Sequence, residues 1–175
     1  NHNNGHNQQF EVLLYKRKVT EEITRITENG NPAGAPNQVV QHDMNTSALG
    51  DPVGLLSGID QIYIPSDKKM TALLAKCLEE KQIHYTIGTI ATGDLFMHEQ
   101  KQKQKLHERF EAVAAEMEGG SIGHVCYMNK VPFAVLRSIS DGDGGAMDYA
   151  EFAQQAAKIG IEIVLAFISR LDELE

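Results

Sequence analysis

The sequence predicts an α/β protein in which helices flank a central sheet. Strand-like and helix-like segments alternate from residue 66 to the C-terminus, which is typical of α/β folds. The strand-like segments are short apolar or β-branched runs, whereas the helix-like segments repeat apolar residues at three- and four-residue steps. The 175-residue chain is 42% hydrophobic, an ordinary share for a domain with its own core.

The first part of this pattern holds a helix, a strand and a second helix. Ser66 and Asp67 supply N-cap oxygens for the first helix. Residues 84–92 are rich in β-branched side chains, which favours a strand, and residues 99–110 predict a charged helix. The apolar face of the first helix comprises Met70, Leu73, Leu74, Cys77 and Leu78.

The second part predicts two buried strands, at residues 112–116 and 132–139, on either side of a helix at residues 119–129. In that helix Ile122, Val125 and Cys126 share one face, which we expect to pack on the sheet. A long C-terminal helix follows. Its single predicted apolar stripe comprises Phe152, Ala156, Ile159, Ile163, Phe167 and Leu171.

The first 38 residues differ from the rest. The chain holds 16 basic and 24 acidic residues, a net charge of −8, yet residues 1–38 carry four of each sign. They also hold seven Asn residues, and turn formers crowd positions 29–37. We predict an atypical leader or linker over residues 1–38 and a folded domain over residues 39–175. A tag-like leader without function is the alternative for the first segment.

Composition argues against several classes of protein. An acidic chain matches phosphate backbones poorly, so nucleic-acid binding is not expected. Cys77 and Cys126 are too scattered for a disulfide framework and suit a reducing cytoplasm. No apolar run reaches the ~18–20 residues of a membrane span, and no signal-peptide pattern is visible. We expect a cytoplasmic protein with no metal or cofactor and no membrane partner.

Three polar clusters follow predicted strands, at residues 92–97, 116–120 and 137–141. Ligands of open α/β sheets bind beyond the carboxyl ends of the strands, so these clusters outline a pocket. Glu116 ends an apolar strand, and a buried carboxylate needs a partner, for which Arg137 is the obvious candidate. Singly, each acid has a plainer alternative: Asp94 as a turn residue, Glu118 as a first-turn helix acid, and Asp141 as an N-cap or Asx-turn.

Together these motifs resemble the 5′-methylthioadenosine/S-adenosylhomocysteine nucleosidases of the nucleoside phosphorylase superfamily. The main features are Glu116-Met117-Glu118-Gly119 and, about 20 residues later, Arg137-Ser138-Ile139-Ser140-Asp141. The resemblance runs from about Val39 to the C-terminus. Further matching segments are Gln41-His42-Asp43-Met44, Gly93-Asp94-Leu95-Phe96, His124-Val125-Cys126 and Val131-Pro132-Phe133.

The resemblance implies a three-layer nucleosidase-like fold with a central mixed sheet, whose N-terminal strands are partly missing here. It implies hydrolysis of the N-glycosidic bond of a 5′-thio-substituted nucleoside, with release of adenine and without a cofactor. It also implies a homodimer, in which residues 42–54 reach the neighbouring subunit's 5′ substituent.

The resemblance assigns the base and sugar contacts to five residues. Phe96 would stack on adenine, and the backbone of Met97 would bind the base. Met117 would pack on the sugar, and Glu118 would bind the ribose hydroxyls. Tyr149 stands where the family usually has a pocket-lining Phe.

Four more residues complete the predicted site. Asp141 would protonate N7 of the purine as a general acid, with a pKa raised by a dry pocket and nearby carboxylates. Ser140 would orient Asp141, while Glu116 and Arg137 complete the substrate-binding set. The predicted catalytic pair is therefore Asp141 and Glu118.

The sequence also departs from the family. The family's Gly-Ala-Met turn, with its water-activating Glu, and its Gly-rich loop near the ribose have no counterpart in this sequence. We therefore expect an N-terminally incomplete member with impaired hydrolysis. A purine nucleoside phosphorylase ranks lower because no basic phosphate-binding segment is visible. A third reading is a catalytically inert fragment that binds nucleoside weakly or associates with itself.

Overall fold

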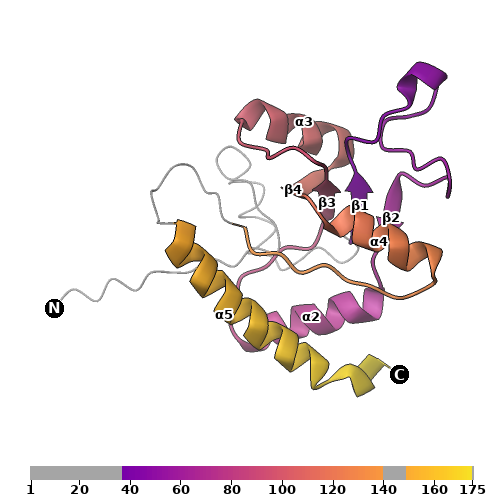
Figure 1. The fold of residues 1–175 in the computed structure, drawn as a ribbon. Helices are drawn as coiled ribbons and strands as arrows, with labels where there is room; N and C mark the ends of the chain where they lie inside the picture. Colours follow the sequence, from indigo (N-terminus) through magenta and orange to yellow (C-terminus); the bar gives the residue numbers. More distant parts are fainter. Residues whose placement is uncertain (1–36, 140–148, 175) are drawn as a thin grey trace.

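The computed structural model describes residues 37–139 and 149–174, and Figure 1 shows the arrangement of their helices and strands. Four strands form one sheet in the order β2-β1-β3-β4. β2 is antiparallel to β1, whereas β3 is parallel to both β1 and β4. The predicted mixed sheet flanked by helices is therefore confirmed. The strands are β1 (Gln38–Gln41), β2 (Tyr63–Pro65), β3 (Thr89–Thr92) and β4 (Ala112–Glu116).

Helices cover both faces of this sheet. Successive strand residues point to opposite sides, so the apolar runs of the strands make both faces apolar. Val39 and Ile90 face α4 (Gly119–Met128), while Val40 and Ala91 pack with Phe110 of α3 (Gln100–Phe110). A third apolar cluster joins α2 (Lys68–Glu80) to α5 (Tyr149–Ile168) beside the sheet (Figure 1). The remaining elements are η1 (Ser47–Leu49) and η2 (Leu171–Leu174).

Several predicted elements are confirmed closely. Asp67 is the N-cap of α2, and its Oδ1 accepts a hydrogen bond from the backbone N of Met70 at 2.8 Å. The charged helix α3 and the strand β4 lie where the sequence placed them, although Ala112 is the one buried residue of β4. These elements carry local signals, a cap and a clear apolar period, that do not depend on distant packing.

The predicted strand at residues 84–92 is shorter in the structure, where only Thr89–Thr92 is β-strand. Its central neighbour β1 has only four residues, which pair with these four. On the other side the register with β4 shifts between Thr89 and Ile90. The ladder therefore has no partner for residues 84–88, whatever their β propensity.

The predicted strand at residues 132–139 is wrong. This segment carries no assigned strand, and its backbone contact with the end of β2 is one hydrogen bond, from Asp67 N to Phe133 O at 2.7 Å. Phe133 and Val135 pack into the cluster under α4, and Leu136 packs into the cluster between α2 and α5. Burial between these layers, not strand pairing, explains the apolar composition.

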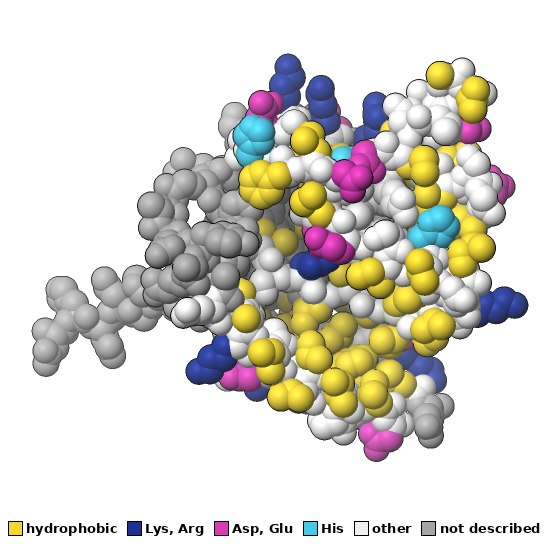
Figure 2. All heavy atoms as spheres, in the orientation of Figure 1, with side chains coloured by type: hydrophobic (Ala, Val, Ile, Leu, Met, Phe, Trp, Pro, Cys, Tyr) yellow, Lys and Arg dark blue, Asp and Glu magenta, His cyan; other side chains and the backbone are white. Residues whose placement is uncertain are grey.

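The predicted orientation of α4 is wrong for Ile122 and Val125, although Cys126 does pack against the cluster of Val39 and Ile90. Gly119, Gly120 and Gly123 are its buried residues, whereas Ile122 and Val125 are 55% and 64% exposed. A Cβ at position 123 would lie 2.9 Å from both Phe133 Cζ and Val39 Cγ2, so the helix lies against the sheet through its glycines. Figure 2 shows the apolar side chains gathered on the outward face over α4 and α5.

α5 packs on α2 through Ile163, which is 1% exposed and meets Leu73, Cys77 and Leu78. Part of the predicted stripe is confirmed, since Ile159 and Phe167 pack against the same cluster. Leu171 instead lies in η2 and is 44% exposed. The prediction of a single stripe is wrong, because a second apolar stripe lies on the opposite, exposed side. It comprises Ile161, Val164, Leu165 and Ile168.

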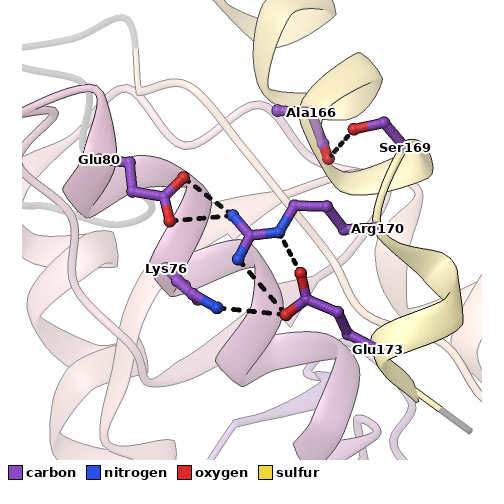
Figure 3. Close-up of polar contacts among 6 residues, drawn as sticks. All are labelled: Lys76, Glu80, Ala166, Ser169, Arg170 and Glu173. Atoms are coloured by element: carbon purple, nitrogen blue, oxygen red, sulfur yellow. Dashed lines mark hydrogen bonds and ion pairs between the residues drawn. The ribbon is translucent and has the colours of Figure 1, made fainter.

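Ion pairs join α2 to the residues that follow α5 (Figure 3). Arg170 Nη1 donates to both carboxylate oxygens of Glu80, at 3.0 and 2.8 Å, and its Nε donates to Glu173 at 2.6 Å. Lys76 Nζ also reaches Glu173, at 3.2 Å. The hydrogen bonds from Arg170 and Lys76 lower the pKa of the Glu173 carboxyl. The network fixes η2 against α2.

Within the described residues, no helix combines the length and the apolar character needed to cross a membrane.

Replacing Gly123 with Ala tests the glycine-mediated packing of α4. We expect overpacking to lower the free energy of unfolding by about 1–3 kcal/mol, offset by at most about 1 kcal/mol of helix propensity. The matched control is Gly160→Ala in α5, where a Cβ would meet nothing within 4 Å. There we expect a gain of about 0.5–1 kcal/mol. Urea unfolding of the three proteins measures both, and a stabilised Gly123→Ala protein would contradict the packing.

Replacing Glu173 with Gln tests the ion network. A carboxyl whose pKa is lowered on folding adds stability above its unfolded pKa and loses it as the pH falls. We therefore expect a lower melting temperature near neutral pH, and a difference that shrinks in acid and in high salt. Asp172→Asn, an exposed acid in the same turn, serves as the control. Equal effects of both substitutions at every pH would refute a specific role for the network.

Candidate functional site

The carboxyl ends of β3 and β4 lie side by side, because Thr92 and Glu116 are register partners in this parallel pair. The loop at residues 93–97 follows β3 directly, and α4 begins three residues after β4. Two of the three predicted polar clusters are therefore neighbours at one edge of the sheet. Arg137 brings the third, as its contacts show.

Glu116 is the centre of this site, with a side chain only 10% exposed. Its Oε1 accepts a hydrogen bond from Thr92 Oγ1. Its Oε2 accepts from the backbone N of Glu118 at 3.1 Å and of Gly119 at 2.7 Å, and from Arg137 Nη2. The predicted pairing of a buried Glu116 with Arg137 is confirmed. A carboxylate at the start of α4 also lies at the positive end of the helix dipole.

Arg137 also holds the second acid of the motif. The same Nη2 donates to Glu118 Oε2 at 2.8 Å, so the guanidinium lies between two carboxylates. Glu118 is the N-cap residue of α4, and its side chain is 60% exposed. Glu116 is thus enclosed by the protein, whereas Glu118 is oriented but accessible to a ligand. Met117, between them, is 45% exposed.

Sequence reasoning included Thr92 in a polar cluster but assigned it no role. Its hydroxyl donates to Glu116 and accepts a hydrogen bond from Gly120 N at 2.6 Å, so it joins the end of β3 to the first turn of α4. Gln41, at the end of β1, donates to Gly120 O at 3.3 Å. Only its place at the end of a strand, directly before Gly93, signalled such a role for Thr92.

His42 and Asp43, which directly follow β1, hold the loop after β3 in place. Asp43 Oδ2 accepts a hydrogen bond from Asp94 N at 2.8 Å, and Gly93 lies against His42 so closely that a Cβ would be 2.2 Å from Nε2. Burial lowers the pKa of His42, although the charge of Asp43 opposes the shift. The matching segments around residues 42 and 93 are therefore in direct contact.

This loop presents an aromatic ring to solvent. Phe96 is 68% exposed, and its ring is nearly parallel to that of His98, with an interplanar angle of 7° and centroids 6.4 Å apart. Met97 is partly buried. An exposed aromatic ring on the loop that follows β3 offers a flat apolar surface for a ligand.

Three predicted site residues are not placed. Ser140 and Asp141 lie outside the described residues, and so does the side chain of Tyr149, whose backbone begins α5. Across residues 37–139 and 149–174, no group of three His, Cys, Asp or Glu side chains could hold a metal ion.

Comparison with known proteins assigns the family. A model described as the phosphorylase superfamily matches residues 35–169. The chain is 38% identical over 136 residues to an aminodeoxyfutalosine nucleosidase of Campylobacter jejuni. The aligned residues cover 77% of this chain and 59% of that protein. The chain is also 35% identical over 138 residues to a 5′-methylthioadenosine/S-adenosylhomocysteine nucleosidase of Staphylococcus epidermidis, covering 77% and 60%.

Solved structures agree with this assignment. The crystal structure of a Campylobacter jejuni 5′-methylthioadenosine/S-adenosylhomocysteine nucleosidase superposes with a TM-score of 0.72 at 35% identity, over 80% of this chain and 64% of that one. A futalosine hydrolase of Helicobacter pylori gives 0.70 at 33% identity, over 77% and 57%. The chain belongs to the phosphorylase superfamily, and its resemblance to the nucleosidases is confirmed. It spans about three fifths of the length of the curated relatives it matches.

Replacing Thr92 with Val tests the link between β3 and α4. The change keeps the shape but leaves Gly120 N–H and a Glu116 oxygen without their partner, so we expect a loss of about 1–3 kcal/mol in unfolding free energy. Thr92→Ser keeps the hydroxyl and should lose only about 1 kcal/mol, for one methyl group. Urea unfolding distinguishes the two, and equal losses would show that the hydroxyl contributes no more than the methyl group.

Proposed function

We propose that this chain is a purine nucleoside N-ribosyl hydrolase whose substrates are 5′-substituted adenine nucleosides such as 5′-methylthioadenosine and S-adenosylhomocysteine. The observation that carries the proposal is the arrangement of two carboxylates on one guanidinium: Glu116 is enclosed, and Glu118 is held by Arg137 but open to a ligand. The names of the relatives agree with a nucleosidase activity.

The reaction replaces the bond between C1′ of the ribose and N9 of the base by a bond to the oxygen of water. The new C1′ hydroxyl keeps one hydrogen of the water and the other goes to the protein or solvent, while the base leaves with a proton from the general acid. Positive charge develops on the sugar and negative charge on the departing base. Glu118, ionised, would accept hydrogen bonds from the ribose hydroxyls and stabilise the sugar's charge. Asp141, oriented by Ser140, would deliver the proton to N7.

The base itself would bind beside the loop after β3. Phe96 would stack on the purine, and its 68% exposure leaves the ring available for such a contact. The backbone of Met97 would hydrogen-bond the base. Met117 would pack on the sugar, and Tyr149 would line the pocket.

Hydrolysis fits this site better than phosphorolysis. Phosphate needs unpaired cationic or N–H donors, whereas the Arg137 guanidinium already lies between two carboxylates, which repel an anion. A purine nucleoside phosphorylase therefore remains the lower-ranked alternative.

The 5′ substituent separates the candidate substrates. The relatives are named for methylthioadenosine and adenosylhomocysteine or for aminodeoxyfutalosine, so the last is a second candidate substrate. The segment at residues 42–54 would meet that substituent across a homodimer. In support, Leu49 on η1 is 83% exposed, an apolar side chain available for a neighbouring subunit.

The reaction also needs a base that activates the attacking water, and no residue of this sequence is assigned that role. If the remaining groups give no turnover, the chain would act as a nucleoside-binding or self-associating protein.

Incubation of the full chain with each of the three nucleosides tests the proposal, with chromatography of the released base and calorimetry of binding. We expect release of the base that does not depend on phosphate. Asp141→Asn should reduce it by about 10²–10⁴-fold. Glu118→Gln should reduce binding and release together.

Asp172→Asn, an exposed acid on η2, is the control and should change neither quantity. A rate that rises with phosphate would favour the phosphorylase. Neither binding nor release would contradict the proposal and support the inert fragment.

A further inference from the structure

The loop between β3 and α3 carries the exposed Phe96 ring and has few backbone links to the rest of the protein. At its start, Gly93 N donates to Glu116 O at 3.1 Å, and α3 begins only at Gln100. Within the described part of the chain, the backbone N–H groups of residues 94–98 donate one hydrogen bond to a residue outside the loop. That bond runs from Asp94 N to Asp43 Oδ2 at 2.8 Å, and it sets the direction in which the loop leaves the sheet.

Asp43 lies on a turn that is itself well anchored. The preceding residue, His42, extends the parallel pairing of β1 with β3, because its N donates to Thr92 O at 2.9 Å. The following residue, Met44, donates from its N to Gln41 O at 3.2 Å. The Asp43 carboxylate is therefore presented from a backbone-bonded turn beside the carboxyl end of β3.

The turn and the loop are in close contact at Gly93. This glycine is buried, and a Cβ there would lie 2.2 Å from His42 Nε2 and 2.9 Å from Asp43 Oδ2. The missing side chain thus allows the carboxylate to reach the next amide along the chain, that of Asp94. A hydrogen bond from an amide to an ionised carboxylate is stronger than one between neutral groups.

We propose that Asp43 is a positioning residue for the base: by accepting the Asp94 N–H, it holds the loop so that Phe96 and the backbone of Met97 meet the purine. Asp43 need not touch the base itself. Phe96 lies two residues beyond the bonded amide, so release of that amide frees up to roughly 7 Å of backbone. Binding geometry tolerates only about 0.5 Å. The inference rests on the proposed function, in which this loop binds the base.

Two other roles for Asp43 compete with this one. As a merely structural residue, it would affect the folded fraction of the protein and not the affinity of the folded molecules. As a direct ligand of the 5′ substituent, since it belongs to the segment at residues 42–54, it would affect nucleosides but not the free base. Free adenine has neither a ribose nor a 5′ substituent, so its binding distinguishes the three roles.

Calorimetric titration of the full chain with free adenine tests the proposal. We expect Asp43→Ala to raise the Kd for adenine about tenfold with an unchanged stoichiometry. Asp43→Asn keeps an oxygen that accepts the Asp94 N–H, so most of the affinity should remain. The matched control is Glu108→Ala, which removes an exposed carboxylate of α3 that accepts a hydrogen bond of the same length, 2.8 Å, from Gln104. It should bind adenine as the wild type does.

Gly93→Ala moves the loop without removing the acid. Its Cβ would occupy the place of the His42 ring and the Asp43 carboxylate, so we expect a loss of adenine affinity similar to that of Asp43→Ala. Circular dichroism of each variant checks that the helices persist.

A measurement without ligand separates this inference from the proposed function. In amide-resolved hydrogen exchange by NMR, Asp43→Ala should speed exchange of the Asp94 amide about tenfold and shift the signals of residues 95–97. The amides of β3 and α3 should keep their exchange rates. Asp43→Asn should restore the wild-type pattern.

Four results would overturn the proposal. Unchanged exchange at Asp94 in Asp43→Ala would show that the carboxylate does not hold the loop. Equal losses of affinity in Asp43→Ala and Asp43→Asn would assign the effect to charge. A lower stoichiometry at an unchanged Kd would leave only a structural role. An unchanged Kd for adenine with a weaker affinity for nucleosides would make Asp43 a ligand of the sugar or its substituent.

Failure of the proposed function has a different signature. If the wild-type chain binds neither adenine nor a nucleoside, the proposed function fails, and with it the role of this loop in base binding. The exchange measurement still decides whether Asp43 holds the loop, because it requires no ligand.

Discussion

The buried carboxylate of Glu116 is the constraint on which the site depends. It accepts hydrogen bonds from β3, from the first amides of α4 and from Arg137, so one side chain fixes three segments that are distant in sequence. An enclosed carboxylate without these donors would be strongly unfavourable. Because the same Nη2 of Arg137 donates to Glu116 and to Glu118, the second acid receives a defined position while staying exposed.

The glycines of α4 make this arrangement possible and also shape the outside of the molecule. Gly120 lies so close to β3 that its N–H reaches Thr92 at 2.6 Å, and a Cβ there would lie 2.7 Å from the same side chain. Close contact on one side directs the large apolar residues of the helix to the other. The site and the exposed apolar residues of α4 are thus two consequences of one packing choice. The same framework that orients Glu118 exposes Ile122 and Val125.

Local signals allowed much of the fold to be predicted. Three local patterns each predicted an element that the structure contains: the N-cap at Asp67, the charged helical segment of α3 and the apolar run of β4. The short strands β1 and β2, of four and three residues, carried too little pattern to be recognised. At the site, the Glu116–Arg137 pair was predictable because a buried acid needs a partner. Thr92 was not, since a threonine at a strand end has many ordinary roles.

The sequence alone determined the order of the four helices and of strands β3 and β4, the motif that identifies the superfamily, and the identity of the charged groups at the site. The tertiary structure decided which side of each element is buried. Residues 132–139 are apolar because they lie between layers and not because they pair as a strand. α4 faces the sheet with glycines and α5 is apolar on two sides. Periodicity reports that a face is apolar, but only the distances between packed elements decide what that face meets.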